Sequence, residues 1–385
     1  MEAFSFARTI LVHDWLTGMR GGEKCLDVLC RALPDAPLYT LLHKPGSVSS
    51  CIENRRIRRS LLQWLPGVSR YYRYTLPLMP FAAGWKLPDC DLVVSMSHCV
   101  AKSAQAPPGV PHVSYCFTPM RYAWHMRDAY FNGRLGKLKA VAVDRLLAAI
   151  RRWDLRTADR VTHFVAISRT IQKRIADCYS RDSVVIHPPV DTDFYTPVPE
   201  QREDYYLVVS AFAPYKRIDL AIDACRQLGR RLVVIGSGQD EARLKTLAGP
   251  DVQFLGWQSD ESIRSHLRRC RALLFPGEED FGIVPVEANA CGTPVIAYAR
   301  GGATETVLPL GASPTPTGVW FGYQSSEVMV EGMQRFERNE AAFQQKSLRR
   351  QALQFSKARF EQELMGYLES VVRPATTASS TRIAA

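Results

Sequence analysis

Two glutamates at a fixed spacing are the most suggestive residues of this sequence. Glu279 and Glu287 lie in the segment ProGlyGluGluAspPheGlyIleValProValGlu, residues 276–287. The segment follows a short apolar run, which predicts a strand, then a loop over Glu278–Ile283, then a helix that carries Glu287. Carboxylates in such a loop can accept hydrogen bonds from sugar hydroxyls, and free N–H groups at a helix start favour an anion by about 0.3–1 kcal/mol. The pattern fits equally well a capping role for Glu279 and Asp280 and a surface position for Glu287.

A lysine and several glycines follow other predicted strands of the second half. Lys216 comes after the apolar run 205–210, and its point charge on a flexible stem suits phosphate neutralisation, although a lone lysine is also a common surface residue. Gly236 and Gly238 end the next predicted strand, and Trp257 ends the one after it. Trp257 either packs on a nucleotide base or packs only on its own domain.

The first half offers weaker candidates at the same kind of position. Gly21 and Gly22 follow the first apolar run, where glycines let backbone N–H groups approach a phosphate, although most glycine pairs are only turns. His98 and Lys102 follow a second buried run, and Arg121 follows a third. Arg121 suits an anion contact, and Lys102 and Arg121 are the candidate contacts of an acceptor. A histidine after a strand is often a structural residue, so both interpretations of His98 stay open.

Short apolar runs alternate with amphipathic stretches along the whole chain, which predicts parallel sheets with helical crossovers. A proline-rich segment, 184–200, interrupts the alternation, and the pattern then restarts. We therefore predict an α/β protein with two doubly wound, Rossmann-like domains that face each other across a cleft. Ligands of such sheets lie at the carboxyl ends of the strands. The predicted parts are an N-terminal domain, a C-terminal domain, a helix packing back on the N-terminal domain, and a disordered tail: 1–195, 196–355, 356–372 and 373–385.

The spacing Glu279–Glu287, with PheGly inside it and AlaCysGlyThrProVal after it, resembles the E-x(7)-E signature of retaining GT-B glycosyltransferases of the group 1 family. The resemblance implies that Glu279 holds the donor sugar and that Glu287 holds the ribose of the nucleotide. It also implies a donor-binding loop in which backbone amides contact the sugar and diphosphate. The residues of that loop are Phe281, Gly282, Ile283 and Val284.

The segment 210–222 is similar to the part of that family that brings an arginine and a lysine to the donor diphosphate. Lys216 stands at the lysine position, but Ala211 stands at the arginine position, which leaves one cation fewer. By the same resemblance, Gly21 and Gly22 lie near the diphosphate. Gly236, Gly238 and Trp257 resemble the loops that meet the nucleotide base.

Two further segments, 95–102 and 115–124, resemble the bacterial O-antigen and exopolysaccharide mannosyltransferase branch. Many family members carry a histidine near the reacting carbon where this chain has Phe117. Since phenylalanine can neither accept a hydrogen bond nor transfer a proton, His98 is the nearest candidate in sequence to replace it. We therefore assign Glu279, Lys216 and, as the candidate replacement, His98 to catalysis.

The function implied by the resemblance is transfer of a hexose with retention, in the first place mannose from GDP-mannose, to a lipid-linked saccharide during cell-surface polysaccharide synthesis. The alternatives are a UDP-sugar-dependent transferase of the same fold and a catalytically silent sugar-binding relative, the latter because of Ala211 and Phe117. The nucleotide sugar is then a substrate, and neither a cofactor nor a metal is expected. The pairs Asp89/Asp91 and Asp191/Asp193 are interpreted as structural.

The net charge of +11 is unevenly distributed. Residues 1–198 hold 27 basic and 16 acidic side chains, whereas the rest holds 22 of each. Arg55, Arg56, Arg58 and Arg59, followed by ArgTyrTyrArgTyr at 70–74, suit adsorption to an anionic leaflet and a polyprenyl-diphosphate-linked acceptor. A solvated charged face explains the same residues. A nucleic-acid-binding protein is the third alternative, but the sequence shows no motif for it.

The remaining composition points to a reduced, cytoplasmic protein, peripheral at most on the inner face of the plasma membrane. Neither a signal peptide nor an apolar run of membrane-spanning length is recognised. The ten cysteines form no C-x-x-C pair and no metal-type spacing, and most lie in apolar surroundings.

Overall fold

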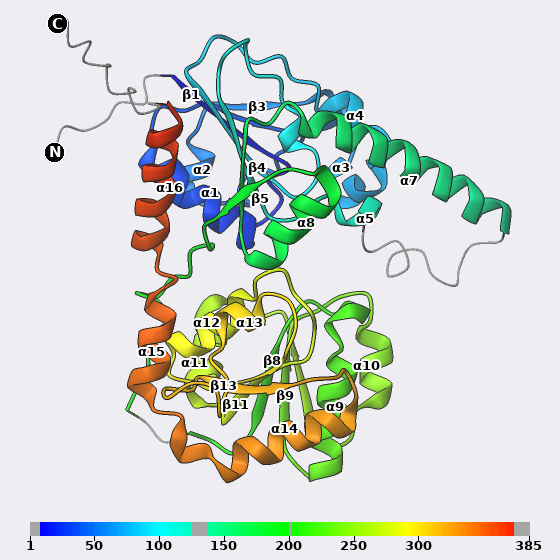
Figure 1. The fold of residues 1–385 in the computed structure, drawn as a ribbon. Coiled ribbons are helices and arrows are strands. Elements are labelled where there is room, and N and C mark those ends of the chain that lie inside the picture. Colours follow the sequence, from blue (N-terminus) through cyan, green and yellow to red (C-terminus); the bar gives the residue numbers. More distant parts are fainter. Residues whose placement is uncertain (1–7, 125–136, 200–201, 373–385) are drawn as a thin grey trace, which may run out of the picture. The chain divides into compact units, whose positions relative to one another are not determined.

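The structure, a computed structural model, describes residues 8–124, 137–199 and 202–372. The chain divides into two compact units, each with its own parallel sheet (Figure 1). The first unit comprises Met1–Ile167, Ile171–Ile186 and Phe360–Ala385, and the second comprises Ser168–Thr170 and His187–Arg359. The prediction of two doubly wound α/β domains is therefore confirmed.

The first unit contains a seven-stranded parallel sheet with the order β3-β2-β1-β4-β5-β6-β7. Its core strands are almost continuous apolar runs, as expected of strands covered on both faces. The strands are β1 Thr9–His13, β2 Leu38–Thr40, β3 Ile57–Arg59, β4 Leu92–Ser97, β5 His112–Cys116, β6 His163–Ala166 and β7 Ser183–Val185.

Helices flank this sheet, and most of them are short (Figure 1). The α-helices are α1 Gly21–Ala32, α2 Ser50–Glu53, α3 Val68–Tyr71, α4 Met79–Ala82, α5 Arg121–Trp124, α7 Lys137–Ala158, α8 Arg169–Tyr179 and α16 Lys357–Val372. The 3-10 helices are η1 Leu61–Trp64, η2 Tyr72–Thr75 and η3 Ala101–Ser103. No helix among the described residues is long and apolar enough to span a bilayer.

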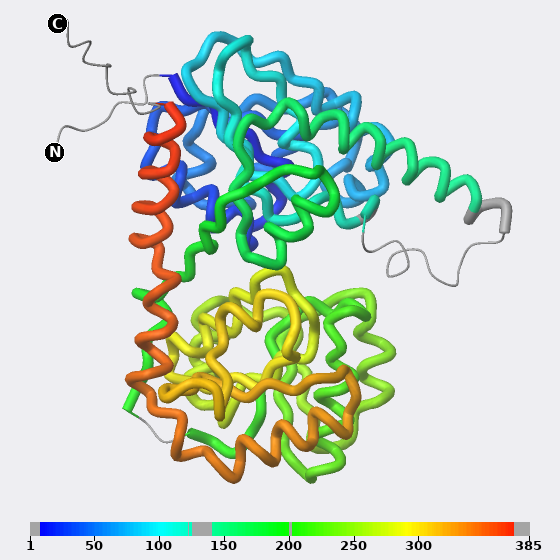
Figure 2. Tube along the Cα trace, in the orientation of Figure 1, coloured from blue at the N-terminus to red at the C-terminus, as the bar shows by residue number. Residues whose placement is uncertain are grey.

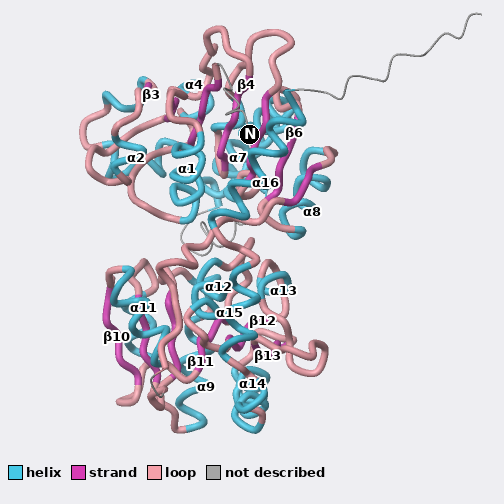
Figure 3. The backbone as a smooth tube through the Cα atoms, turned by 90° about the vertical axis from the view of Figure 1, so that its left-hand side faces the viewer, coloured by secondary structure: helices cyan, strands magenta, loops and turns pink. Residues whose placement is uncertain are grey.

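The second unit repeats the design with a six-stranded parallel sheet of order β10-β9-β8-β11-β12-β13, and its strands lie side by side in Figure 3. The strands are β8 Tyr206–Val209, β9 Leu232–Ile235, β10 Val252–Gly256, β11 Ala272–Phe275, β12 Val295–Tyr298 and β13 Gly318–Phe321. The helices are α9 Ile218–Leu228, α10 Glu241–Leu247, α11 Asp260–Arg269, α12 Ile283–Ala290, α13 Ala303–Thr306, α14 Ser326–Arg338, α15 Gln345–Leu353, η4 Pro214–Lys216 and η5 Glu340–Ala342.

Each sheet starts in the middle and reverses direction once. The first goes outward from β1 to β3 and returns to β4, and the second goes from β8 to β10 and returns to β11. Strands β1 and β4 are neighbours, but the chain continues from β1 toward one side of the sheet and from β4 toward the other side. The same holds for β8 and β11 in the second sheet. Such topological switch points are where open parallel sheets form their binding crevices.

The structure moves the predicted boundary at residue 195 back to Ile186. The proline-rich segment after Ile186 is held by the second unit, because three of that unit's arginines donate to its carbonyl oxygens. Arg264, Arg268 and Arg349 bind the carbonyls of Phe194, Thr196 and Tyr195 at 3.1, 2.6 and 2.6 Å.

The last described residues, from Phe360, belong to the first unit (Figure 2). Phe360 packs edge-to-face on Tyr115 with ring centroids 5.5 Å apart, and Tyr367 contacts His163 in the same way at 6.4 Å. Helix α16 thus covers strands β5 and β6. The predicted disordered tail, 373–385, lies outside the described residues.

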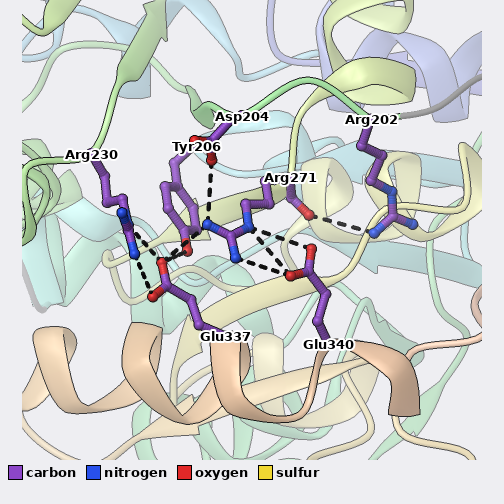
Figure 4. Close-up of polar contacts among 7 residues, drawn as sticks. All are labelled: Arg202, Asp204, Tyr206, Arg230, Arg271, Glu337 and Glu340. Carbon is purple, nitrogen blue, oxygen red and sulfur yellow. Dashed lines mark hydrogen bonds and ion pairs between the residues drawn. The ribbon is translucent and has the colours of Figure 1, made fainter.

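A charged network anchors the amino ends of the strands in the second unit, opposite the switch point (Figure 4). Glu337 of α14 accepts two hydrogen bonds from Arg230, at 2.8 and 2.9 Å, and one from the Tyr206 hydroxyl at 2.8 Å. Arg271, just before β11, pairs with Glu337 at 3.3 Å and with Glu340 at 3.0 Å. Several bidentate contacts fix the amino ends of these strands. The loops at their carboxyl ends therefore extend from strands that are held firmly in place.

Candidate functional site

The switch point of the second unit brings together two of the residues assigned to catalysis. Lys216 ends η4 after strand β8, and Glu279 lies in the loop after β11. The Lys216 ammonium forms an ion pair with the Glu279 carboxylate, and their side chains are 13% and 25% exposed. The pair is therefore within reach of a ligand while it is shielded from most of the solvent.

Glycines let three loops approach each other closely around this pair. A Cβ on Gly277 would lie 2.9 Å from the Lys216 Cα, and a Cβ on Gly302 would lie 2.1 Å from the Phe281 Cα. The Gly302 N–H donates to the Glu279 carbonyl at 2.8 Å. Gly301 has a φ of +67°, a conformation that favours glycine. The glycine pair after β12 therefore holds the backbone of the Glu279 loop.

Helix α12 begins beside the pair. Gly282, with a φ of +85°, occupies the N-cap position, and no side chain caps the helix start at Ile283 and Val284. The alternative in which Glu279 and Asp280 are N-cap residues is therefore wrong. The donor-binding residues Phe281, Gly282, Ile283 and Val284 do lie together at this helix start.

The side chains of Phe281 and Glu287 are both buried, at 3% and 5% exposure. Phe281 packs on His187 and Phe355, with ring centroids 5.6 and 5.5 Å away, so it can offer a ligand its backbone but not its ring. Glu287 is not the surface acid that the alternative interpretation required. Burial, and next the Glu287 charge, raise the pKa of the neighbouring Tyr195.

The glycines after β9 have a structural explanation. A Cβ on Gly236 would lie 1.9 Å from the Ser210 carbonyl oxygen, and one on Gly238 would lie 2.4 Å from the Phe212 carbonyl oxygen. They allow the loops after β8 and β9 to touch. Trp257 differs, because its side chain is 78% exposed and therefore does not pack on its own domain.

The switch point of the first unit is built around Asp14, a residue that the sequence interpretation missed. Asp14 follows β1 directly, and its carboxylate is fully buried. Its oxygens accept backbone N–H groups from the four residues after β4, at 2.7, 3.0, 2.7 and 2.7 Å: His98, Cys99, Val100 and Ala101. A polar residue directly after the first buried strand was the signal that could have identified it.

Asp14 also binds the imidazole of His98, with 3.0 Å between Nδ1 and Oδ2. Burial would raise the pKa of Asp14, but the charge and the hydrogen bonds of His98 outweigh burial and lower it to about 2. The His98 side chain is 29% exposed, and its ring lies edge-on to Trp15 with centroids 4.5 Å apart.

Phe117 lies between two histidine–carboxylate pairs. Its ring centroid is 6.3 Å from that of His98 and 6.5 Å from that of His13. His13 is wholly buried, with Nε2 3.8 Å from Glu23. Burial would raise the pKa of Glu23, but the interaction with the neighbouring His13 outweighs burial and lowers it. A Cβ on Gly22 would lie 3.4 Å from the Phe117 ring, so the glycines that open α1, Gly21 and Gly22, lie next to this cluster.

The prediction that Lys102 contacts an acceptor is wrong. Its side chain is 2% exposed, and its ammonium lies 2.9 Å from the Asp154 carboxylate and 3.1 Å from the Thr157 hydroxyl. It also lies over the Tyr179 ring, 4.9 Å from the centroid. Lys102 therefore fastens α7 to the sheet. Arg121 opens α5 and is half-buried, and its anion contact stays a prediction.

One member of each aspartate pair, Asp91 and Asp191, forms an ion pair within its own unit. Asp91 binds Arg8 at 2.8 Å, and Asp191 pairs with Lys357 and accepts the Phe194 N–H at 3.2 Å.

Comparison with protein-family models matches both halves of the chain to glycosyltransferases. Residues 19–194 match Glycosyltransferase Family 4, and residues 191–355 match the glycosyl transferases of group 1. The chain is thus of the GT-B glycosyltransferase type, with two adjoining family matches over residues 19–355.

The curated relatives include two mannosyltransferases and a D-inositol 3-phosphate glycosyltransferase. The alpha-1,3/1,6-mannosyltransferase of Kluyveromyces lactis is 23% identical over 342 residues, which cover 74% of this chain and 66% of the relative. A GDP-mannose-dependent phosphatidylinositol monomannoside mannosyltransferase of Mycolicibacterium smegmatis is 32% identical, over 39% of this chain and 47% of the relative. A D-inositol 3-phosphate glycosyltransferase of Mycobacteroides abscessus is 31% identical, over 47% and 43%. The chain spans less than half the length of the last two relatives.

Solved structures confirm the fold. HepE from Anabaena in complex with UDP-glucose has a TM-score of 0.69 at 19% identity, covering 94% of this chain and 99% of that one. A sucrose-phosphate synthase from Thermosynechococcus elongatus has a TM-score of 0.70 at 16% identity, with the same coverage. At these identities the likeness shows the GT-B fold alone.

Proposed function

We propose that this protein transfers a hexose from a nucleotide sugar to an acceptor hydroxyl with retention of configuration. The observation that carries the proposal is the Lys216–Glu279 pair at the switch point of the second unit, beside the uncapped start of α12. A cation, a carboxylate and free helix N–H groups are the groups needed to bind a diphosphate and a sugar together.

The two members of the pair would exchange partners when the donor binds. Lys216 would move from Glu279 to the diphosphate, and Glu279 would accept hydroxyls of the sugar. Departure of the nucleoside diphosphate develops negative charge, which Lys216 and the N–H groups at Ile283 and Val284 stabilise. The buried Glu287 would accept the ribose hydroxyls. The leaving phosphate itself would take the proton of the acceptor, which attacks from the same face.

Nearby arginines do not make up for the missing cation at Ala211. Arg217 binds Asp219 at 3.2 Å, and Arg243 binds Asp240 at 2.7 Å and approaches Asp219 at 3.9 Å. Lys216 would therefore carry a large share of the phosphate charge in this protein, and its removal is expected to be severe.

Mannose from GDP-mannose is the proposed donor, because two of the relatives described above are mannosyltransferases and one depends on GDP-mannose. The HepE complex with UDP-glucose supports a UDP-sugar as the second candidate. The acceptor would be a lipid-linked saccharide of a cell-surface polysaccharide.

A thermal-shift screen against GDP-, UDP- and ADP-sugars tests the donor, because a ligand that binds only the folded state raises the melting temperature. Transfer from labelled GDP-mannose to a polyprenyl-diphosphate saccharide, with the anomeric configuration of the product, tests the reaction. Lys216→Ala and Glu279→Gln should slow transfer by roughly two orders of magnitude or more. The matched control variants are Lys245→Ala and Glu241→Gln, which change an exposed ion pair of α10 with 2.8 Å between its charged atoms. These two variants should transfer sugar as the wild type does. Binding without turnover would favour the silent relative.

A segment of the first unit supports a membrane-bound acceptor. Helices η1, α3, η2 and α4 pack around the buried side chains of Leu62, Val68, Tyr72 and Met79. They leave four large apolar side chains more than 80% exposed: Leu61, Trp64, Tyr74 and Phe81. Five arginines of the same stretch are also exposed: Arg56, Arg58, Arg59, Arg70 and Arg73. We call these nine residues the aromatic–arginine patch.

Exposed aromatic rings beside arginines suit the interface of an anionic bilayer, where the rings enter the headgroup region and each cation contributes about 1 kcal/mol. Arg55 is excluded from the patch, because its guanidinium donates to the carbonyl oxygens of Leu33 and Pro34 at the end of α1. The structure thus gives the four arginines of residues 55–59 two different roles.

Sedimentation with vesicles of phosphatidylcholine, with and without phosphatidylglycerol, tests the patch. The triple variant Trp64→Ser/Tyr74→Ser/Phe81→Ser should lose binding to anionic vesicles, whereas Leu247→Ser, an exposed leucine of α10, should keep it. Equal binding of the triple variant and the control would refute the membrane role. Binding of the wild type to an oligonucleotide but not to vesicles would favour the nucleic-acid alternative.

A further inference from the structure

The imidazole of His98 in the first unit is held at one nitrogen, whereas the other edge of the ring is open. Phe117 follows strand β5, and its side chain supplies no polar group. The His98 ring lies next to that phenylalanine, 6.3 Å away between centroids, at the carboxyl ends of β1 and β4.

Asp14 determines which nitrogen of His98 carries the proton. The pKa of Asp14 is lowered to about 2, so its carboxylate is ionised at neutral pH and can only accept hydrogen bonds. His98 Nδ1 lies 3.0 Å from that carboxylate and must therefore be the protonated nitrogen. In the neutral ring, the lone pair is then on Nε2.

The contacts of Asp14 leave it little freedom to move. Both carboxylate oxygens accept two backbone N–H groups each, and the residue is fully buried. Trp15 and Phe117 contact the His98 ring edge-to-face. The imidazole is held in one orientation before any ligand arrives, which is how a rigid support makes a side chain an effective ligand-binding group.

The open edge of the ring is available to a ligand. The His98 side chain is 29% exposed, and among the described residues no hydrogen bond to Nε2 is found. His13 is the competing imidazole, but its side chain is wholly buried and faces Glu23 at 3.8 Å. Besides Asp14, the titratable groups described next to this site include His13, Glu23 and the buried Cys99, whose backbone N–H binds Asp14. Of the two imidazoles, His98 is the one that a ligand can reach.

We propose that His98 Nε2 accepts a hydrogen bond from a sugar hydroxyl of the bound substrates, and that Asp14 is the positioning residue that fixes this tautomer. The inference rests on the proposed function for the identity of the ligand. It also explains the phenylalanine at position 117, whose ring supports the His98 ring from the side instead of carrying the polar group itself.

Two substitutions of His98 distinguish its two nitrogens. In His98→Asn the side-chain amide can still donate to Asp14 but does not reach the Nε2 position, whereas in His98→Gln it reaches that position. We expect transfer from GDP-mannose to be at least about tenfold slower in His98→Asn than in His98→Gln, the usual cost of one hydrogen bond to a ligand. His163→Asn and His163→Gln, at the exposed start of β6, are the matched controls and should both behave as wild type. Equal rates for both His98 variants would overturn the role of Nε2.

Nitrogen NMR of histidine-labelled protein tests the positioning role without relying on turnover. The wild-type spectrum should show His98 protonated at Nδ1, and GDP-mannose with acceptor should shift the Nε2 resonance. Protonation at Nε2 in the wild type would overturn the positioning role of Asp14. This measurement needs no substitution of Asp14 and so does not depend on whether such a variant folds. If the wild type transfers no sugar from any nucleotide, the proposed function fails. If it transfers sugar and His98→Asn is as fast as wild type, only this inference fails.

Discussion

The two switch points each place a carboxylate and a nitrogen-bearing side chain at the same topological position but hold them differently. In the first unit, the Asp14 carboxylate is fully buried and is held by four backbone N–H groups as well as by His98. In the second unit, Lys216 and Glu279 are partly exposed and hold each other. Asp14 is thus held within the fold by buried backbone groups, whereas Lys216 and Glu279 are partly open to the solvent.

The difference shows how one topology supports two roles. The Asp14 carboxylate accepts hydrogen bonds from four backbone N–H groups. If it bound a substrate instead, those buried groups would lose their acceptor, so Asp14 can orient a neighbour but cannot itself bind substrate. Lys216 and Glu279 are both partly exposed, so we expect their ion pair to contribute less to stability than the contacts of Asp14. Under the proposed function, its members can therefore rebind to a donor at a lower cost. The comparison predicts opposite outcomes for substitutions at the two sites.

The largest expected effect is that of Asp14→Ala on stability. The substitution removes a buried charge and leaves four amides and one imidazole without their acceptor, so the free energy of unfolding should fall by about 3–5 kcal/mol. Denaturation in urea, followed by circular dichroism, measures it. Glu279→Ala should change stability by less than about 1 kcal/mol. A similar loss in both variants would contradict the distinction between a fixed and an exchangeable pair.

Lys216→Ala should show the reverse pattern. We expect kcat for hexose transfer to fall by roughly two to three orders of magnitude, because one preorganised group that stabilises the leaving diphosphate is removed. The unfolding free energy should remain within about 1 kcal/mol of wild type. Steady-state kinetics and urea denaturation of the same sample measure both quantities. Normal kcat in a folded variant would remove Lys216 from the catalytic machinery.

Gly302→Ala tests the loop that holds Glu279. Since the new Cβ would lie 2.1 Å from the Phe281 Cα, the loop must shift, with an expected cost of about 3 kcal/mol and a loss of donor binding. Gly322→Ala is the matched control, because it follows the neighbouring strand and a Cβ there meets no atom within 4 Å. Calorimetry of donor binding and thermal unfolding compare the two variants. Unchanged donor affinity in Gly302→Ala would show that the loop does not position Glu279.

The smallest expected effect is a pH dependence that belongs to Asp14. Its pKa is lowered from 3.8 to about 2 in the folded state, so its contribution to stability is fully present above about pH 4 and is lost as the pH falls through the folded pKa. The contribution should amount to about 2 kcal/mol. Urea denaturation at pH 6 and at pH 2–3, for wild type and Asp14→Asn, measures it as the difference between their pH slopes. Parallel slopes would contradict it.

The local pattern of apolar and polar residues predicted much of the fold and of the switch point in the second unit. The alternation of apolar runs and amphipathic stretches indicated two parallel-sheet domains, and Lys216, Glu279 and the start of α12 were found after their strands. These features depend on neighbours in the sequence: burial of a continuous apolar run, glycine at a sharp turn, and free N–H groups at a helix start. The sequence also identified the exposed arginines 56, 58 and 59 as one charged cluster. It did not show that Arg55, beside them, binds backbone carbonyls instead.

Strand order and long-range packing could not be predicted from the sequence. Asp14 and the backbone of His98 are 84 positions apart and meet only because β1 lies next to β4. Lys102 was misassigned because its partner Asp154 lies 52 positions away on α7. The burial of Glu287 depends on what packs over α12.

The sequence by itself thus determined the class of the sheets, the loops that carry polar groups, and the kind of chemistry those groups can do. The tertiary structure alone decided which groups face each other and which of them are buried. The physical reason is that helix and strand formation follow local periodicity and backbone preferences, whereas the pairing and the ionisation of a side chain depend on desolvation and on charges that distant parts of the chain supply.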